Sequence, residues 1–182
     1  MKNLIGLAGL ARAGKDTVAS RLHTHHEMDR RAFADPLKVM TAVLAGEPLN
    51  RFYDDAKKEE FSETLGMTRR KAMQLMGTEM IRKHFGPDHW HKLLLTSWRE
   101  RGCPATVVSD VRFDNEAEAI RAAGGIIVRV TRPSAGLSGE NAQHASEAGV
   151  SDHLVDFVLD NSGDYTALFE KVDALVAILK EA

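Results

Sequence analysis

Short apolar runs alternate with longer helical patterns along this chain, and this alternation constrains its fold more than any other feature. The clearest runs are rich in β-branched residues, as expected for strands covered on both faces. They are residues 4–8, 105–109, 126–130 and 155–159. A brief further strand is predicted over 31–34, closed by Asp35-Pro36.

Helical patterns fill the spaces between these runs. They cover residues 15–25, 68–85, 88–101, 115–123 and 165–180. In the fourth, Asn115 is the predicted cap with Glu118 three residues on, and Gly124-Gly125 ends the helix. Strands that alternate with helices predict an α/β fold in three layers, with a mostly parallel five-stranded sheet and right-handed crossovers. We expect one domain over residues 1–182.

Composition limits the classes of function. The 182 residues suit a single core, and a net charge of −2 argues against binding nucleic acid by bulk electrostatics. The single cysteine, Cys103, cannot form an internal disulfide, which fits a reducing cytosol. No apolar run reaches 18 residues. We therefore expect a cytoplasmic protein that binds neither nucleic acid nor a membrane.

A glycine-containing loop joins the first predicted strand to the first helix. Its sequence, Gly9-Leu10-Ala11-Arg12-Ala13-Gly14-Lys15, has the spacing G-x-x-x-x-G-K in the strand–loop–helix context that this motif requires. Such a loop turns backbone N–H groups toward phosphate oxygens, and its lysine reaches the β- and γ-phosphates of ATP. The alternative is an ordinary turn with a surface lysine.

The residues after the lysine depart from the usual pattern. Asp16 stands where a Ser or Thr normally binds Mg²⁺, and Thr17 follows it. The Asp16 carboxylate could bind Mg²⁺ directly or through water, or could position the acceptor. It could also be a plain partner of the helix dipole.

Charged residues follow several predicted strands at their carboxyl ends, where open α/β sheets bind ligands. Asp35 follows the second strand, Asp110 and Arg112 the third, and Arg132 the fourth. Arginines there can hold phosphate and neutralise a transferring group, while carboxylates can hold Mg²⁺ or orient an acceptor. A solvated salt-bridge network is the alternative for any one of them.

Five blocks of sequence carry a resemblance to a known family. Besides the loop through Thr17, they are residues 33–38 (FADPLK), 75–79 (LMGTE), 86–90 (GPDHW) and 109–116 (SDVRFDNE). Together they resemble phage-type deoxynucleoside monophosphate kinases over about residues 1–161. The last block is the most specific of them.

The resemblance implies a fold like that of nucleoside monophosphate kinases, with a helical acceptor-binding region over about 37–104 and a lid over about 132–152. It implies ATP and Mg²⁺ as cofactors, a phage origin with action in the bacterial cytoplasm, and leaves a homodimer open. The expected ATP-binding residues are Gly9, Ala13, Gly14, Lys15, Asp16, Thr17 and Arg132, with Asp16 and Thr17 at the metal. The expected acceptor-binding residues are Asp35, Arg70, Gln74, Thr78, Trp90, Asp110 and Arg112. Lys15, Asp110 and Arg112 are the expected catalytic residues, and His144 is expected in the lid.

Several of these residues also have ordinary interpretations. Trp90 shares a helical spacing with Leu94 that is typical of a core residue, and Gln74 reads as a surface residue. Arg69, Arg70 and Lys71 begin a helix, where the dipole disfavours cations, so an anionic partner is expected there.

The predicted function is ATP-dependent phosphorylation of a deoxynucleoside monophosphate by direct in-line transfer. Two alternatives stay open. One is another small-molecule kinase on the same scaffold, acting on phosphomevalonate or dephospho-coenzyme A, and the other is a regulatory module that binds ATP without catalysis.

Overall fold

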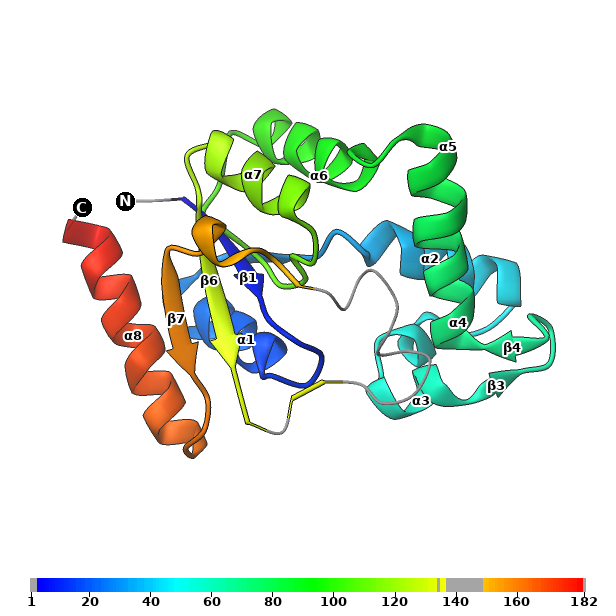
Figure 1. Ribbon diagram of the computed structural model, residues 1–182, viewed down its shortest axis with the longest axis horizontal. Coiled ribbons are helices and arrows are strands. Elements are labelled where there is room, and N and C mark those ends of the chain that lie inside the picture. Colours follow the sequence, from blue (N-terminus) through cyan, green and yellow to red (C-terminus); the bar gives the residue numbers. More distant parts are fainter. Residues whose placement is uncertain (1–2, 134, 137–148, 182) are drawn as a thin grey trace. The chain divides into compact units, whose positions relative to one another are not determined.

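The computed structural model describes residues 3–133, 135, 136 and 149–181 (Figure 1). The chain divides into two compact units, one of Met1–Ala32 with Leu94–Ala182 and one of Phe33–Leu93. The predicted acceptor-binding region, 37–104, overlaps the second unit, but its residues from 94 onward belong to the first. In that stretch the indole Nε1 of Trp98 donates to the Pro104 carbonyl at 2.8 Å.

The first unit contains a five-stranded sheet in which all neighbouring strands are parallel, as predicted. Its order is β2-β5-β1-β6-β7. The strands are β1 (Leu4–Ala8), β2 (Asp29–Arg31), β5 (Thr106–Val108), β6 (Ile126–Thr131) and β7 (Phe157–Asp160). Because β1 lies at the centre, the loop that leaves its carboxyl end emerges between β5 and β6.

The second strand and the segment after it differ from the prediction. The strand is Asp29–Arg31. It joins the sheet by pairing its backbone with β5, so its sequence can be polar and does not show the apolar pattern of the other strands. Asp35-Pro36 does not close a strand but opens the helix α2 (Asp35–Ala45). Proline fits the first turn of a helix, where no amide hydrogen is needed.

Alternate residues of β1 face opposite layers of helices. Ile5 and Leu7 belong to the core cluster formed with α1 (Lys15–His26) and α8 (Tyr165–Glu181). Gly6 faces the other side, where a Cβ would lie 2.7 Å from Cδ1 of Ile120 on α7 (Asp114–Ala122). The predicted three-layer arrangement is confirmed.

The helices α1 and α8 pack against each other and are also joined by charge (Figure 1). The Arg21 guanidinium donates to the Asp173 carboxylate at 3.1 and 2.6 Å, and Nε2 of His26 lies 2.7 Å from the same carboxylate. His23 Nδ1 is 2.8 Å from the Met28 carbonyl. His23 and His26 at the end of α1 therefore make structural contacts, and no cluster of three or more His, Cys, Asp or Glu side chains that could hold a metal ion occurs in the described part of the chain.

The start of α7 is capped two residues earlier than predicted, at Phe113. The helix begins at Asp114, and the Glu116 carboxylate accepts from the backbone N–H groups of Arg112 at 2.9 Å and Phe113 at 3.2 Å. Asn115 and Glu118 therefore do not form the predicted cap. Gly124 follows the helix end with a φ of +84°, as predicted.

The second unit is largely helical. It contains the 3₁₀ helix η1 (Leu49–Phe52), the helix α3 (Asp55–Glu59) and a hairpin of β3 (Phe61–Ser62) and β4 (Met67–Thr68). The predicted helix over 68–85 is one continuous run of α4 (Arg69–Gln74), the π-helix η2 (Leu75–Arg82) and α5 (Lys83–Phe85). Phe52, Ala42 and Ala45 form its small core with Leu65 and Met73.

Two further elements complete the described chain. The helix α6 (His89–Glu100) crosses the boundary between the units, and a 3₁₀ turn, η5 (Asp152–Leu154), precedes β7. Among the described helices, none has both the length and the apolar character needed to cross a bilayer.

Replacing Asp173 by Asn should lower the melting temperature at pH 7 by about 2 °C. Hydrogen bonds from Arg21 and His26 lower the pKa of Asp173 to about 2. A carboxylate with a depressed folded pKa stabilises the fold above its unfolded pKa of about 4, and this contribution is lost as the pH falls through about 2. Thermal melts of D173N and wild type should therefore converge toward pH 2. The exposed Glu170 on the same helix offers the control E170Q, which should melt like wild type.

Candidate active site

The loop between β1 and α1 has a backbone conformation that depends on its glycines. Gly9 has a φ of +129°, and a Cβ on it would lie 2.3 Å from the backbone oxygen of Val130 on β6. Gly14, the residue before α1, has a φ of +106°. No side chain fits at Gly9 without moving the sheet, so the loop lies directly against the backbone of β6.

The carbonyl oxygens of Gly9, Leu10 and Ala11 in this loop accept hydrogen bonds from Lys15 and Gly136. Nζ of Lys15 donates to the carbonyls of Gly9 and Leu10, each at 2.8 Å. The backbone N–H of Gly136 donates to the carbonyl of Ala11 at 2.8 Å. In a trans peptide the C=O and the following N–H point in opposite directions, so the direction of each bonded carbonyl also fixes the direction of an amide. The predicted loop residues Gly9, Ala13, Gly14 and Lys15 are brought together as a phosphate-binding loop would require.

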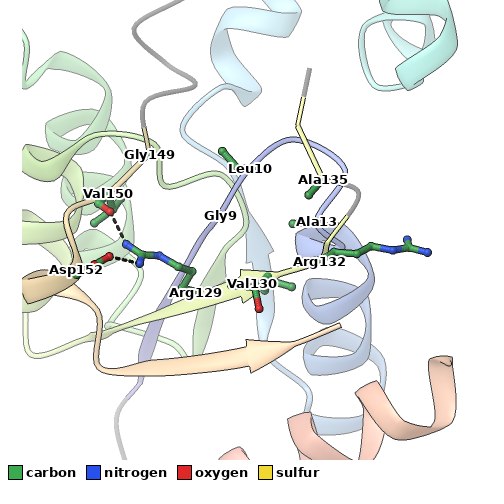
Figure 2. Close-up of a pocket in the computed structure, with 11 residues that line it drawn as sticks. Gly9, Leu10, Ala13, Arg129, Val130, Arg132, Ala135, Gly149, Val150 and Asp152 are labelled. Atoms are coloured by element: carbon green, nitrogen blue, oxygen red, sulfur yellow. Dashed lines mark hydrogen bonds and ion pairs between the residues drawn. The ribbon is translucent and has the colours of Figure 1, made fainter. Parts of the chain in front are cut away.

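A cavity of about 420 Å³ lies beside the loop (Figure 2). It is lined by the loop, the end of β6 and the described residues at both ends of the predicted lid. These are Gly9, Leu10, Ala13, Arg129, Val130, Thr131, Arg132, Ala135, Gly149, Val150 and Asp152. Arg132 is exposed, and its side chain extends away from Arg129 in Figure 2. Most of the predicted lid, including His144, lies outside the described residues.

Arg129 fastens the segment that returns toward β7. Its guanidinium donates to the carboxylate of Asp152 and to the carbonyl of Val150 (Figure 2). Asp114, at the start of α7, accepts from the N–H of Ser151 at 2.7 Å and from its hydroxyl at 2.6 Å. These hydrogen bonds lower the pKa of Asp114. Two elements of the first unit, β6 and α7, thereby hold the far side of the cavity. These contacts were not predicted from the sequence.

The metal candidates stand in the first turn of α1. The Asp16 side chain is 77% exposed and pairs with Arg30, and Thr17 is partly buried. Mg²⁺ is commonly held by one or two carboxylates together with substrate phosphates. One exposed carboxylate and one hydroxyl beside a phosphate loop fit that pattern, with Arg30 as a competing partner of Asp16.

The segment after β5 lies next to the phosphate loop. The backbone N–H of Val111 donates to the Leu7 carbonyl at 3.0 Å, two residues before Gly9. Asp110 and Arg112, on either side of Val111, are partly buried. The Glu116 carboxylate fixes the Arg112 backbone from the start of α7. These two predicted catalytic residues therefore share the carboxyl edge of the sheet with Lys15.

The remaining predicted acceptor residues lie in the second unit. Asp35 accepts from the Tyr53 hydroxyl at 2.9 Å and lies 3.4 Å from Nζ of Lys38. The Lys38 ammonium in turn lies 4.0 Å from the centre of the Tyr53 ring. This side of the unit joins the start of α2 to η1 through a carboxylate, a cation and a phenol.

The arginines that begin α4 have anionic partners inside their own unit. Arg69 is buried, and its Nε donates to the Glu47 carboxylate at 2.5 Å. Burial alone would raise the pKa of Glu47, but hydrogen bonds from Ser62 and Arg69 outweigh it and lower that pKa. Nε of Arg70 donates to Glu59 at 2.5 Å. The two arginines of this run are thus paired with internal carboxylates, and their position is not evidence for an external anion.

The π-helical part of the long helix contains or contacts three predicted acceptor residues, Gln74, Thr78 and Trp90. Gln74 precedes it and Thr78 lies within it, both partly buried. Trp90 is buried, and its Nε1 donates to the Gly77 carbonyl at 3.2 Å. A π-helical turn leaves carbonyls available to such donors and is frequent at functional sites. Trp90 is therefore a buried residue, as the core interpretation predicted. Its contact with the acceptor stays a prediction.

Replacing Gly9 by Ala should destabilise the fold by about 1–3 kcal/mol and sharply weaken ATP binding, because the new Cβ would meet the Val130 backbone. Gly102 offers a matched control, since its φ is +80° but nothing lies within 4 Å of a built Cβ. G102A should carry only the backbone strain and bind ATP normally. Thermal melts and calorimetric ATP titrations would measure both effects, and equal ATP affinity in the two variants would contradict the geometry.

Comparisons with known proteins identify the family of this chain. The model of the deoxynucleotide monophosphate kinase family matches residues 50–172. A protein of Acanthamoeba polyphaga mimivirus, described as a candidate deoxynucleotide monophosphate kinase, is 30% identical over 190 residues that cover 95% of each chain. The deoxynucleotide monophosphate kinase of Enterobacteria phage T4 is 32% identical over 113 residues, which cover 60% of this chain and 46% of that protein.

A solved structure is similar in fold. The dephospho-CoA kinase from Campylobacter jejuni superimposes with a TM-score of 0.55 at 15% identity, over 100% of this chain and 98% of that one. This likeness concerns the fold alone. The matched family model and the mimivirus relative give the narrower assignment: the chain belongs to the deoxynucleotide monophosphate kinase family.

Proposed function

We propose that this chain transfers the γ-phosphoryl group of ATP to the phosphate of a deoxynucleoside monophosphate, forming the diphosphate. The main support is the loop between β1 and α1, whose carbonyls accept hydrogen bonds from within the first unit. The Asp110–Arg112 segment lies next to this loop at the sheet edge. That arrangement occurs in a chain of the deoxynucleotide monophosphate kinase family.

The phosphate loop would bind the donor. The backbone N–H groups from Gly14 into the first turn of α1 would contact phosphate oxygens, since the first amides of a helix have no intrahelical partner. Lys15, whose ammonium lies over the loop carbonyls at 2.8 Å, would turn to the β- and γ-phosphates. Asp16 and Thr17 would hold Mg²⁺, which neutralises phosphate charge when bound.

Arg112 and Asp110 would act at the transferring group. The fork of Arg112 can contact phosphate oxygens in pairs and stabilise charge as it shifts between donor and acceptor. Asp110 would orient the acceptor or the metal. The acceptor phosphate is already charged, so the reaction needs no strong base, and positioning and electrostatics supply the catalysis.

The second unit would bind the acceptor through Asp35, Arg70, Gln74, Thr78 and Trp90. Residues 132–152, with Arg132, would form the lid that excludes water over ATP. A cavity lined by the described residues at both ends of that segment supports this role. Action in a bacterial host cytoplasm and assembly as a homodimer stay predictions.

Deoxynucleoside monophosphates should be the productive acceptors in an ADP-release assay that compares the four of them with their ribose counterparts. Replacing Lys15 by Met should reduce turnover by several orders of magnitude, because the γ-phosphate loses its cation. The exposed Lys180 at the end of α8 gives the control K180M, which should keep full activity.

Two results of this assay would overturn the proposal. ATP binding without acceptor-dependent ADP release would point to a regulatory module. Release with dephospho-coenzyme A or phosphomevalonate, but with no nucleotide, would point to another small-molecule kinase.

Replacing Arg112 by Ala should lower kcat by roughly 10³-fold, as for other arginines that stabilise a transferring phosphoryl group. The KM for ATP should change much less, because the contact strengthens in the transition state. R112K should recover only part of the rate, since an ammonium lacks the planar fork. The exposed Arg99 gives the control R99A. A kcat for R112A within threefold of wild type would remove Arg112 from the reaction centre.

A further inference from the structure

Asn161 lies at the carboxyl end of β7, beside the phosphate loop. Its side chain is buried, with 7% of the residue exposed, and its Nδ2 donates to the Ala13 carbonyl at 2.8 Å. Its backbone N–H donates to the Thr131 carbonyl at 2.8 Å, which continues the pairing of β7 with β6. The sheet therefore fixes where the Asn161 carboxamide stands, and the carboxamide contacts the loop.

The bonded carbonyl belongs to the peptide that joins Ala13 to Gly14. Because this peptide is trans and planar, a carbonyl held toward Asn161 directs the Gly14 N–H the opposite way. Gly14 is the residue before the first turn of α1, so this amide adjoins the amides that face a phosphate. Without the bond, the peptide could rotate and replace an N–H by a carbonyl oxygen, which repels an anion.

Gly14 shows how closely the two elements fit. A Cβ built on Gly14 would lie 2.3 Å from Nδ2 of Asn161. The glycine of the G-K pair is thus required by Asn161 as well as by its own φ of +106°. Lys15 and Gly136 bond the carbonyls of Gly9, Leu10 and Ala11, and Asn161 supplies the donor for Ala13.

We infer that Asn161 is a positioning residue for ATP, which acts through the Ala13–Gly14 peptide and orients the Gly14 amide toward the polyphosphate. The inference rests on the proposed function in taking the loop as the ATP site. It predicts that Asn161 affects the affinity for polyphosphate and leaves the affinity for the acceptor unchanged.

The main test replaces Asn161 by Leu, which has a similar volume and no donor. The KM for ATP and the Kd for inorganic pyrophosphate should each rise about tenfold, the size expected for one lost hydrogen bond. The KM for the deoxynucleoside monophosphate should stay within about twofold. Steady-state kinetics and calorimetric titration measure these values. Should N161L not fold, N161A removes the same donor with a smaller side chain and should give the same pattern.

Thr106 provides a matched control at the opposite end of the sheet. It is buried at the start of β5, and its hydroxyl donates to the Pro104 carbonyl at 2.9 Å. T106V therefore also removes a buried bond from a side chain to a backbone carbonyl. It should lower the melting temperature and leave both KM values and the pyrophosphate Kd unchanged.

Two outcomes would overturn the inference. A melting temperature that falls in N161L and N161A with no change in ATP or pyrophosphate affinity would make Asn161 merely structural, like Thr106. Equal rises in the KM for ATP and for the acceptor would also contradict it. Pyrophosphate titration separates this result from the proposed function, because it reports on the loop even if no nucleotide is phosphorylated.

Discussion

The backbone contact between Gly9 and Val130 is the constraint on which the site depends. The carbonyl of Val130 occupies the position that any side chain at Gly9 would need, so the loop can follow β1 only along this path. The parallel pairing of β1 with β6 sets the spacing of the two strands at that point. The phosphate loop is therefore an extension of the sheet, and its amides are preorganised before any ligand arrives.

The same sheet edge gathers groups from other strands. The segment after β5 is tied to Leu7 through Val111, and the Glu116 carboxylate holds the backbone of Arg112. These bonds fix the backbone from which the Asp110 and Arg112 side chains extend. Catalysis by positioning favours such a fixed backbone, because less freedom is then lost when a ligand binds.

The sequence predicted those parts of the fold that depend on apolar periodicity. Four strands and the long helices agree to within a few residues, because their side chains meet a core on one or both faces. The second strand was predicted over 31–34 but lies at Asp29–Arg31. The prediction was wrong because backbone pairing, and not side-chain burial, holds this strand in the sheet. The prediction of the α7 cap was wrong because the sequence has a glutamate at both 116 and 118. Only the geometry of the turn decides which carboxylate accepts from the backbone N–H groups.

The site residues show a similar division. The positions of the β1–α1 loop and of the Asp110–Arg112 segment at the carboxyl edge of the sheet were predictable because each follows a recognisable strand. Asn161 also follows one, the run 155–159, and the rule applied to the other strands would have identified it. The partners of Arg69 and Arg70 had no such signal, because Glu47 and Glu59 reach them only through the folding of the hairpin and α3.

The pairing of Arg70 with Glu59 sets a condition on how the second unit can bind a nucleotide. The Arg70 side chain is 11% exposed and Glu59 is 36% exposed, so the carboxylate is the more accessible member of the pair. A phosphate that binds Arg70 must either share the guanidinium with Glu59 or displace it. Sharing places two anions together and weakens binding, whereas displacement exposes Glu59 to solvent, where its charge is well hydrated. The carboxylate meanwhile keeps the guanidinium oriented. An acceptor carrying two negative charges would compete with a single carboxylate for Arg70 more effectively than a neutral acceptor would.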